Sequence, residues 1–259
     1  MAGDKSNIPS LKAFFDSKVA VYNQVSFIKD DPICIPHLFS KKQDIEIAGF
    51  FASIFAWGNR TTIIQKSKEL MQLMDNAPHQ FCRGHQESDL KKLLAFKHRT
   101  FNTTDLLYFI EFLKTHYNTH ESLETAFLLS PDKDPAARLH HFHQYFFSLP
   151  DAPPRTKKHI ATPIKGSTCK RLNMYLRWMI RNDKTGVDFG IWKSLSPSLL
   201  SCPLDVHSGN VARKLGLLKR KQNDAKALAE LDVSLRKMDK NDPVKYDFAL
   251  FGLGVFEKF

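Results

Sequence analysis

Residues 44–57 read DIEIAGFFASIFAW, and this segment decides the class of fold. Asp44 can cap a helix that runs to about Trp57, and the side chains between them are apolar nearly all round. A helix without a polar face belongs in the centre of a hydrophobic core. The segment therefore predicts a core built on a helix.

Helical spacing recurs on both sides of this segment, whereas strand-like alternation is almost absent, so we predict an all-α fold. Capping residues, prolines and glycines mark further helices. They open at Thr61 or Thr62, at Thr104 with Asp105, at Asp134-Pro135, at Thr168 (to about Arg181), at Leu204 (to Leu215, before Gly216) and at Asp242-Pro243.

The prolines at 150, 153 and 154 interrupt regular structure and mark the best boundary between two lobes. We predict one compact two-lobed helical unit over residues 1–259, with the lobe junction at about residues 150–165. The length and the 42% apolar content are those of an ordinary globular chain with ample core material.

The excess of basic over acidic residues lies entirely in the C-terminal two-fifths of the chain. Residues 1–154 hold 17 Lys/Arg and 17 Asp/Glu, whereas residues 155–259 hold 21 and 10. Such an excess of one sign in an otherwise balanced chain favours a polyanionic partner, above all nucleic acid. A solvated surface and a membrane surface are the alternatives, and neither basic stretch has the clean apolar face of a membrane anchor.

Lys170 falls in the first turn of the helix that Thr168 would cap, close to Lys165, Arg171 and Arg177. The positive end of the helix dipole and these cations all disfavour an ammonium. We therefore expect a neutral amine, which is the form that attacks a sugar C1′ or a carbonyl to give a Schiff base. The alternative is a lysine that contacts a phosphate or is merely exposed.

Asp205 lies in the segment PLDVH at 203–207, where a proline precedes a helix and an acid falls at or near the N-cap. Plain helix capping, worth about 1 kcal/mol, explains such a residue. A carboxylate there could instead stabilise an oxocarbenium-like sugar cation or orient a water. His207 is a candidate general base or a structural histidine.

The sequence offers no convincing metal site. His116 and His120 have helical i, i+4 spacing, but no acidic or cysteine partner completes a set with ligand spacing. The four cysteines are scattered without a CxxC pair, which is typical of reduced thiols. We expect no metal and no other cofactor.

Two segments together resemble the helix-hairpin-helix DNA glycosylase superfamily, which includes endonuclease III and the archaeal oxidised-guanine glycosylases. GSTCKRLNM at 166–174 resembles the end of the hairpin and the helix that carries the lysine nucleophile. PLDVH at 203–207 with VARKLGL at 211–217 is similar to the stretch that carries the catalytic aspartate. The helix pair over 45–74 resembles the superfamily's opening helices. The whole chain also resembles an uncharacterised bacterial family of similar length, most clearly over 169–181, 203–207 and 242–254.

The chain departs from the superfamily pattern in three ways. Lys170 and Asp205 are 35 residues apart, a spacing closer to the archaeal enzymes, and an insert around Trp192 accounts for it. Only Gly166 stands where the usual hairpin has two glycines. The C-terminal cysteine cluster of the iron–sulfur members is missing, so no cluster is implied.

The resemblance implies a two-lobed helical fold with the active site in a cleft between the lobes. It implies a DNA base-excision glycosylase with AP-lyase activity that acts on damaged duplex DNA, an oxidised purine being a candidate base. Lys170 would attack C1′ of the flipped nucleotide, and Asp205 would stabilise the developing positive charge. DNA contacts would come from Lys165, Gly166, Ser167, Thr168, Arg171, Arg177, His207, Arg213, Lys214, Asn59 and Arg60.

Two other functions fit the same residues. One is a non-enzymatic helical module that binds DNA or RNA through the basic lobe, and the other is an enzyme for another phosphorylated or nucleotide substrate. We expect a soluble, cytoplasmic protein, because no apolar run reaches the length of a signal peptide or a membrane span. We also expect a monomer associated with the nucleoid.

Overall fold

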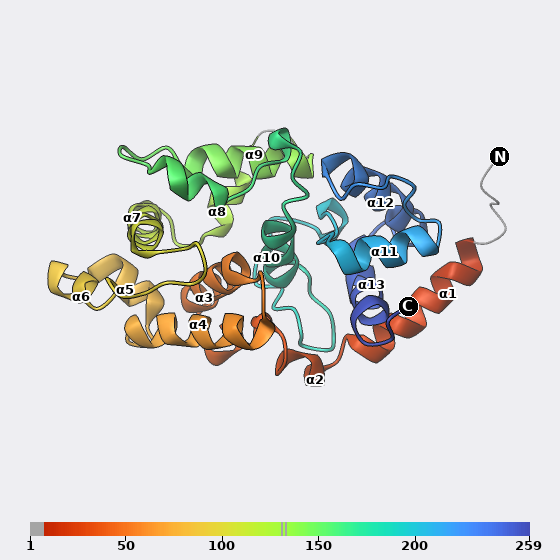
Figure 1. Cartoon of the computed structure of the whole chain (residues 1–259), viewed down its shortest axis with the longest axis horizontal. Helices are drawn as coiled ribbons and strands as arrows, with labels where there is room; N and C mark the ends of the chain where they lie inside the picture. The colour runs from red at the N-terminus through yellow and green to blue at the C-terminus, as the bar shows by residue number, and fades with distance from the viewer. Residues whose placement is uncertain (1–7, 131, 133) are drawn as a thin grey trace. The chain divides into compact units, whose positions relative to one another are not determined.

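The computed structural model describes residues 8–130, 132 and 134–259, and these residues form helices and turns with no β-strand among them (Figure 1). The prediction of an all-α fold is confirmed for this part of the chain. It divides into two compact units. The central unit is Ile28–Thr162, and the terminal unit joins residues 8–27 to Pro163–Phe259. The short helix α2 (Val25–Ile28) spans the boundary in sequence.

The central unit contains seven α-helices among its described residues, together with three short 3-10 turns. The helices are α3 (Lys42–Phe55), α4 (Arg60–Leu73), α5 (Pro78–Gly84), α6 (Glu87–Lys91), α7 (Thr103–Thr119), α8 (Glu124–Leu128) and α9 (Pro135–Phe146). The 3-10 turns are η2 (Pro32–Cys34), η3 (Pro36–Leu38) and η4 (Pro154–Lys158).

Helix α3 is the centre of this unit, as its sequence predicts, because every residue from Asp44 to Phe55 is buried. The ring of Phe50 contacts the rings of Phe109, Phe142 and Phe146 at centroid distances of 5.6 to 6.0 Å. Each such aromatic pair contributes about 0.5–1.5 kcal/mol beyond the area it buries. These contacts pack α7 and α9 against α3.

The start of α3 differs from its prediction. The helix begins at Lys42 with Lys41 as N-cap, so the prediction that Asp44 caps it is wrong. Asp44 lies in the first turn, where its Oδ1 accepts a hydrogen bond of 2.8 Å from the backbone N–H of His79 at the start of α5. The carboxylate therefore satisfies the exposed amide of a different helix, a tertiary contact that local sequence does not reveal.

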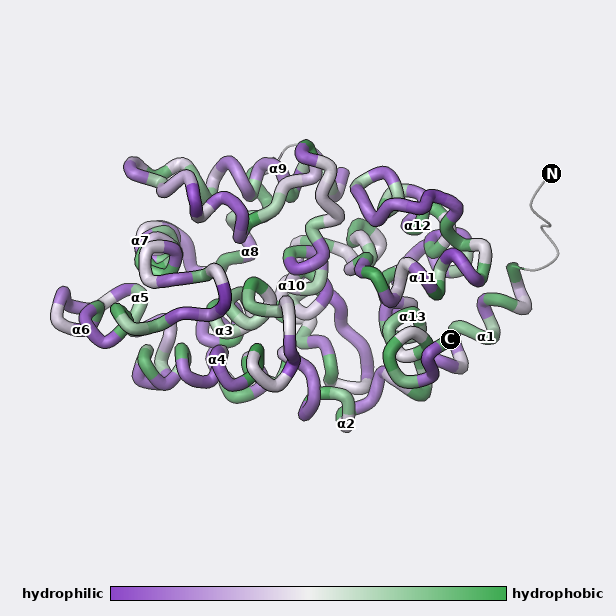
Figure 2. Tube along the Cα trace, in the orientation of Figure 1, coloured by the Kyte–Doolittle hydropathy of each residue, from purple (hydrophilic) through white to green (hydrophobic). Residues whose placement is uncertain are grey.

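The terminal unit contains five α-helices and three 3-10 turns among its described residues (Figure 1). Helix α13 is the most apolar of them, and Figure 2 colours most of it as hydrophobic. The elements are α1 (Ile8–Tyr22), η5 (Pro163–Lys165), α10 (Lys170–Ile180), η6 (Pro197–Leu199), α11 (Val206–Lys214), α12 (Ala225–Met238), η7 (Pro243–Lys245) and α13 (Tyr246–Val255).

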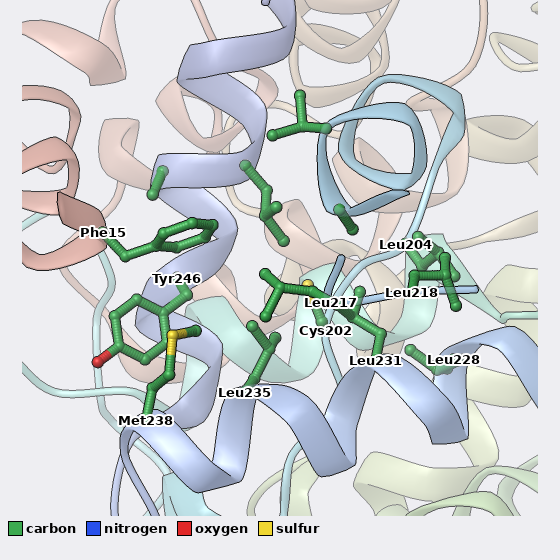
Figure 3. Packing of buried hydrophobic residues seen from close by; sticks show 14 of the residues in the cluster. Phe15, Cys202, Leu204, Leu217, Leu218, Leu228, Leu231, Leu235, Met238 and Tyr246 are labelled. Atoms are coloured by element: carbon green, nitrogen blue, oxygen red, sulfur yellow. The ribbon is translucent and has the colours of Figure 1, made fainter. Parts of the chain in front are cut away.

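The core of the terminal unit contains side chains from both α1 and α13, which are far apart along the chain. Figure 3 shows Phe15 of α1 beside Tyr246 of α13, and their ring centroids are 5.7 Å apart in an edge-to-face arrangement. Leu231 and Leu235 of α12 complete this cluster, and neither has any exposed surface. The first helix thus packs against the last, a pairing that the sequence analysis did not predict.

Replacement of Gly252 by alanine is expected to weaken the contact of α1 with α13. A Cβ at this position would overlap the ring of Tyr22, which stacks on Phe256 and donates a hydrogen bond to Glu257. We expect Gly252→Ala to lower the free energy of unfolding by about 1–3 kcal/mol in urea titrations.

The matched control is the same substitution in a Tyr22→Ala background. There the overlap is gone, and alanine is favoured over glycine in a helix by about 1 kcal/mol. Gly252→Ala should then be neutral or stabilising. An equal loss of stability in both backgrounds would contradict this account of the α1–α13 contact.

Candidate active site

A tight turn precedes α10. The backbone N–H of Gly166 donates to the carbonyl of Pro163 over 2.8 Å, and Gly166 has a φ of +78°. Cys169, the N-cap of α10, also has left-handed backbone, with a φ of 49°. This conformation costs a non-glycine residue roughly 1–2 kcal/mol. A hydrogen bond of 3.0 Å from the Cys169 N–H to the Ser167 hydroxyl helps to hold it.

Asp205 is the N-cap of α11, as its sequence position predicts. Its Oδ1 accepts from the backbone N–H of Ser208 over 3.0 Å, and the Ser208 hydroxyl accepts from the Asp205 N–H over 2.9 Å. The amide of Asn223 donates to the carbonyl of Asp205 over 2.9 Å. Three separate contacts thus fix the start of this helix.

One side-chain contact joins the starts of the two helices. The Thr168 hydroxyl donates to the carbonyl of Leu204 over 3.2 Å, so the residue before the N-cap of α10 is tied to the residue before the N-cap of α11. Thr168 was predicted to cap α10, and the N-cap is instead Cys169. The hydroxyl connects two segments that are 36 residues apart.

This arrangement brings Lys170 and Asp205 together. The Lys170 Nζ lies 2.9 Å from the Asp205 Oδ2, and the two side chains keep 32% and 21% of their surface exposed. Cations were the neighbours expected for Lys170, and the structure places a carboxylate beside it. The two residues that the sequence singled out for chemistry therefore form one ion pair that solvent reaches.

The Asp205 carboxyl is ionised at neutral pH. Burial acts to raise its pKa, but the charge of Lys170, its hydrogen bond and those from Ser208 outweigh burial and hold the pKa below the usual 3.8. A carboxylate that keeps its charge at a site that solvent can reach is able to stabilise a positive charge that develops beside it.

Several residues predicted to contact DNA lie on the surface of the terminal unit. Lys165, Gly166, His207 and Lys214 are exposed, and Ser167, Thr168 and Arg171 are half-buried. Lys165, Gly166 and Ser167 belong to the turn before α10. That turn also contacts the start of α12, because the Ala225 N–H donates to the Gly166 carbonyl over 3.0 Å.

Arg177 and Arg213 are committed to contacts inside the terminal unit. Arg177 is buried and pairs with Asp188 and Asp247. The Arg213 Nε donates to the carbonyl of Arg220 over 2.8 Å, and its Nη2 donates to Asn223. Both guanidinium groups hold the fold around the Lys170–Asp205 pair.

Asn59 and Arg60 belong to the central unit. Asn59 is the exposed N-cap of α4, where its side-chain oxygen accepts from the Thr62 N–H over 3.1 Å. Arg60 is the first residue of α4. Asn59 thus has a capping role that the sequence analysis assigned to Thr61 or Thr62.

A buried charge cluster, which sequence reasoning missed, extends along the inner side of α10. The Arg181 Nη1 lies 3.0 Å from the Asp188 Oδ2, and the Arg177 Nε lies 3.3 Å from the Asp188 Oδ1. The i, i+4 spacing of the two arginines was the available signal. The cluster consists of Arg177, Arg181, Asp183, Asp188, Asp242 and Asp247, of which Asp183 and Asp242 are half-buried and the others buried.

The histidines examined as metal ligands are used in hydrogen bonds of the central unit. His116 contacts the Ser122 carbonyl and the Tyr145 hydroxyl, both at 3.0 Å, and burial lowers its pKa to about 4. Over residues 8–130, 132 and 134–259, no group of three His, Cys, Asp or Glu side chains could hold a metal ion. No helix in the described chain is long and apolar enough to cross a membrane.

Comparison with known proteins identifies one family. The model of the family described as "Protein of unknown function (DUF2400)" matches residues 31–256, which include both Lys170 and Asp205. No curated protein and no solved structure matches the chain.

The ion pair predicts a pH-dependent contribution of Asp205 to stability. Its folded pKa lies below the unfolded value, so the contribution is present above about pH 4 and is lost as the pH falls through the folded pKa. Asp205→Asn keeps a capping oxygen but removes the charge. It should be less stable than wild type at pH 7, and the difference should shrink between about pH 5 and pH 3 in urea titrations.

Asp205→Ala is the matched comparison, because it removes the cap as well as the charge. It should cost about 1 kcal/mol more than Asp205→Asn at every pH. A difference between Asp205→Asn and wild type that stays constant over this pH range would show that the charge of Asp205 does not contribute.

Proposed function

This chain belongs to the DUF2400 family, since the match covers most of its length, and we propose that it is a DNA base-excision glycosylase with AP-lyase activity. The observation that supports this most directly is the Lys170–Asp205 pair, with Nζ 2.9 Å from Oδ2 at the starts of two helices. An oxidised purine is the base class that the sequence resemblance favours.

The proposed reaction begins with loss of the base. The C1′–N bond breaks and its electron pair leaves with the base, while the Asp205 carboxylate stabilises the positive charge that develops on the sugar. The lone pair of the neutral Lys170 amine then forms the bond to C1′, and the N–H proton that this step releases passes by way of Asp205 to the departed base, whose electron pair accepts it. The C1′–O4′ bond next breaks as the nitrogen lone pair forms the C=N bond, and O4′ takes up a proton from solvent, which gives the Schiff base. Loss of a C2′ proton to solvent then forms the C2′–C3′ double bond, and the C3′–O bond breaks with its electron pair leaving on the 3′-phosphate.

The terminal unit offers groups suited to the DNA backbone. The turn formed by Lys165, Gly166 and Ser167 has an exposed cation and an exposed glycine immediately before the start of α10. Helix starts present unpaired N–H groups and positive partial charge, which favour phosphate. His207 and Lys214, both exposed on α11, are further candidates for backbone contacts.

A second function is favoured by one specific observation. Asp205 caps α11 while Lys170 neutralises it, so the pair is a satisfied structural contact even without chemistry. A helical module that binds DNA or RNA and removes no base would need nothing more. A steep salt dependence of binding is expected from both functions, so affinity alone does not distinguish them.

Borohydride trapping tests the role of Lys170. Reduction should fix a covalent complex between the full chain and duplex DNA that contains an abasic or oxidised site, because sodium borohydride reduces the Schiff base. Lys170→Gln should abolish the complex. Lys237→Gln, which changes an exposed lysine on α12 that is not among the predicted DNA contacts, should retain it. Equal trapping by Lys170→Gln and wild type would exclude Lys170 as the nucleophile.

Base release tests the role of Asp205. With a panel of lesion duplexes, Asp205→Asn should slow release by about 100-fold or more, because the developing charge loses its counter-ion, while DNA affinity stays nearly unchanged. The assay is single-turnover release measured by chromatography of the free base. Normal turnover by Asp205→Asn would leave Asp205 as a cap only. Absence of release by wild type from every duplex would favour the binding module.

A further inference from the structure

The segment between α11 and α12 is a second basic stretch of the terminal unit. Residues 219–226 read KRKQNDAK, with four basic residues and one acid. None of these residues belongs to the predicted DNA contacts. An excess of positive charge on an exposed segment attracts a polyanion when the fold does not neutralise it. The partners of each charged group therefore decide what the segment can bind.

The nearby acids are engaged with the backbone and with the arginine of the stretch. The Asp224 Oδ1 accepts from the Arg220 Nε over 2.7 Å and from the Ala227 N–H over 3.0 Å, which caps α12. The Glu230 carboxylate of α12 accepts from the backbone N–H groups of Lys219 and Arg220 over 2.6 and 3.3 Å. These two carboxylates shape the segment, and Asp224 neutralises Arg220.

The lysines of the stretch lie beside the turn that precedes α10. The Ala225 N–H donates to the Gly166 carbonyl over 3.0 Å, and each of these two residues is next in sequence to an exposed lysine, Lys226 or Lys165. Lys221 is exposed as well. Within the part of the chain that the structure describes, the amines of these three lysines form no ion pair. One backbone contact thus gathers cations from two distant segments.

A second contact fixes the same stretch to the start of α11. The Asn223 amide donates to the Asp205 carbonyl over 2.9 Å, and its oxygen accepts from Arg213. Gly209 leaves the room for this amide, because a Cβ there would lie 2.7 Å from the Asn223 Oδ1. Residues 223–225 are therefore bonded both to Asp205 and to the turn four residues before Lys170.

We propose that Lys165, Lys221 and Lys226 form one surface that binds the sugar–phosphate backbone of duplex DNA beside the candidate active site. A strand carries one phosphate per about 3.4 Å of helix axis, so a strand that contacts one of these lysines brings further phosphates close to the others. Such contacts position the duplex and supply affinity, but they do not read its sequence. The choice of DNA as the polyanion rests on the proposed function.

Salt-dependent binding to a short undamaged duplex tests the surface without base release. We would measure the Kd of the full-length chain by fluorescence anisotropy between about 0.05 and 0.2 M salt. Each phosphate contact contributes about 0.9 to the slope of log K against log salt concentration. The double variant Lys221→Gln/Lys226→Gln should therefore reduce the slope by about 1.8 and weaken binding by roughly 10- to 100-fold in 0.1 M salt.

The matched control is Lys237→Gln/Lys240→Gln, which removes the same charge from two exposed lysines near the other end of α12. Lys237 lies about 16 Å along the helix axis from Lys226, which exceeds the Debye length of about 10 Å in 0.1 M salt. The control should leave the slope nearly unchanged. An equal reduction in both double variants would show that net charge alone acts and would overturn the proposal.

An RNA duplex of the same length identifies the polyanion. A slope reduced by Lys221→Gln/Lys226→Gln with RNA but not with DNA would assign the surface to RNA and overturn the proposal. The expected result is a reduced slope with the DNA duplex.

Borohydride trapping separates this surface from the glycosylase function. Trapping by wild type, combined with equal slopes for wild type and Lys221→Gln/Lys226→Gln, would refute the surface and leave the glycosylase function intact. A reduced slope in that variant, combined with no trapping and no base release by wild type, would refute the glycosylase function and leave the DNA surface intact.

Discussion

The ion pair between Lys170 and Asp205 depends on two helix starts being held at a fixed distance. A helix start carries positive partial charge, which favours a carboxylate and disfavours an ammonium. Asp205 benefits from this field at the start of α11, whereas Lys170, the first residue of α10, is opposed by it. The carboxylate at 2.9 Å compensates the lysine. Because the Thr168 hydroxyl ties the two starts together, the compensation is built into the fold.

The arginines of the α10 segment show that the net charge of the chain is larger than the positive charge that its surface offers to a polyanion. Arg177 and Arg181 are both buried, and both lie over the ring of Phe248, at 4.3 and 5.5 Å. Aspartates of the same unit neutralise the charges of Arg177 and Arg181. Lys165 and Lys214 of the same unit, by contrast, are exposed. The basic residues of this unit therefore have two different roles. Some form buried ion pairs inside the unit, and others are exposed and can attract a polyanion.

Signals that act within a few residues were predictable from the sequence, and those that depend on distant partners were not. The burial of α3 follows from its apolar sequence, and Asp205 as N-cap follows from the proline and acid before a helix. The left-handed backbone of Cys169 is an exception, because the side chain that holds it, Ser167, is only two residues away and still gave no recognisable signal. The true partner of Asp44 is the amide of His79, 35 residues away.

The candidate site shows the same division. Lys170 and Asp205 were found from local context, and their mutual contact depends on Thr168 and Leu204 meeting across 36 residues. The pairing of Asp247 with Arg177 was missed because the two residues are 70 positions apart along the chain. Chemistry-bearing residues can thus be recognised one at a time, while their coupling is visible only in three dimensions.

The Lys170–Asp205 pair differs from the buried ion pairs of the α10 segment in its basic residue, which is lysine rather than arginine. Buried ion pairs favour arginine, whose planar fork can bind two acids and which stays charged in proteins. Arg177 and Arg181 fit that description, and their side chains are no more than 5% exposed. At the start of α10 the chain uses lysine with 32% of its side chain exposed. Lysine is the basic residue of the two that can lose its proton, and a nucleophile requires that loss. The contrast within one helix therefore supports the proposed role of Lys170 as the nucleophile, and it assigns Arg177 and Arg181 to internal ion pairs.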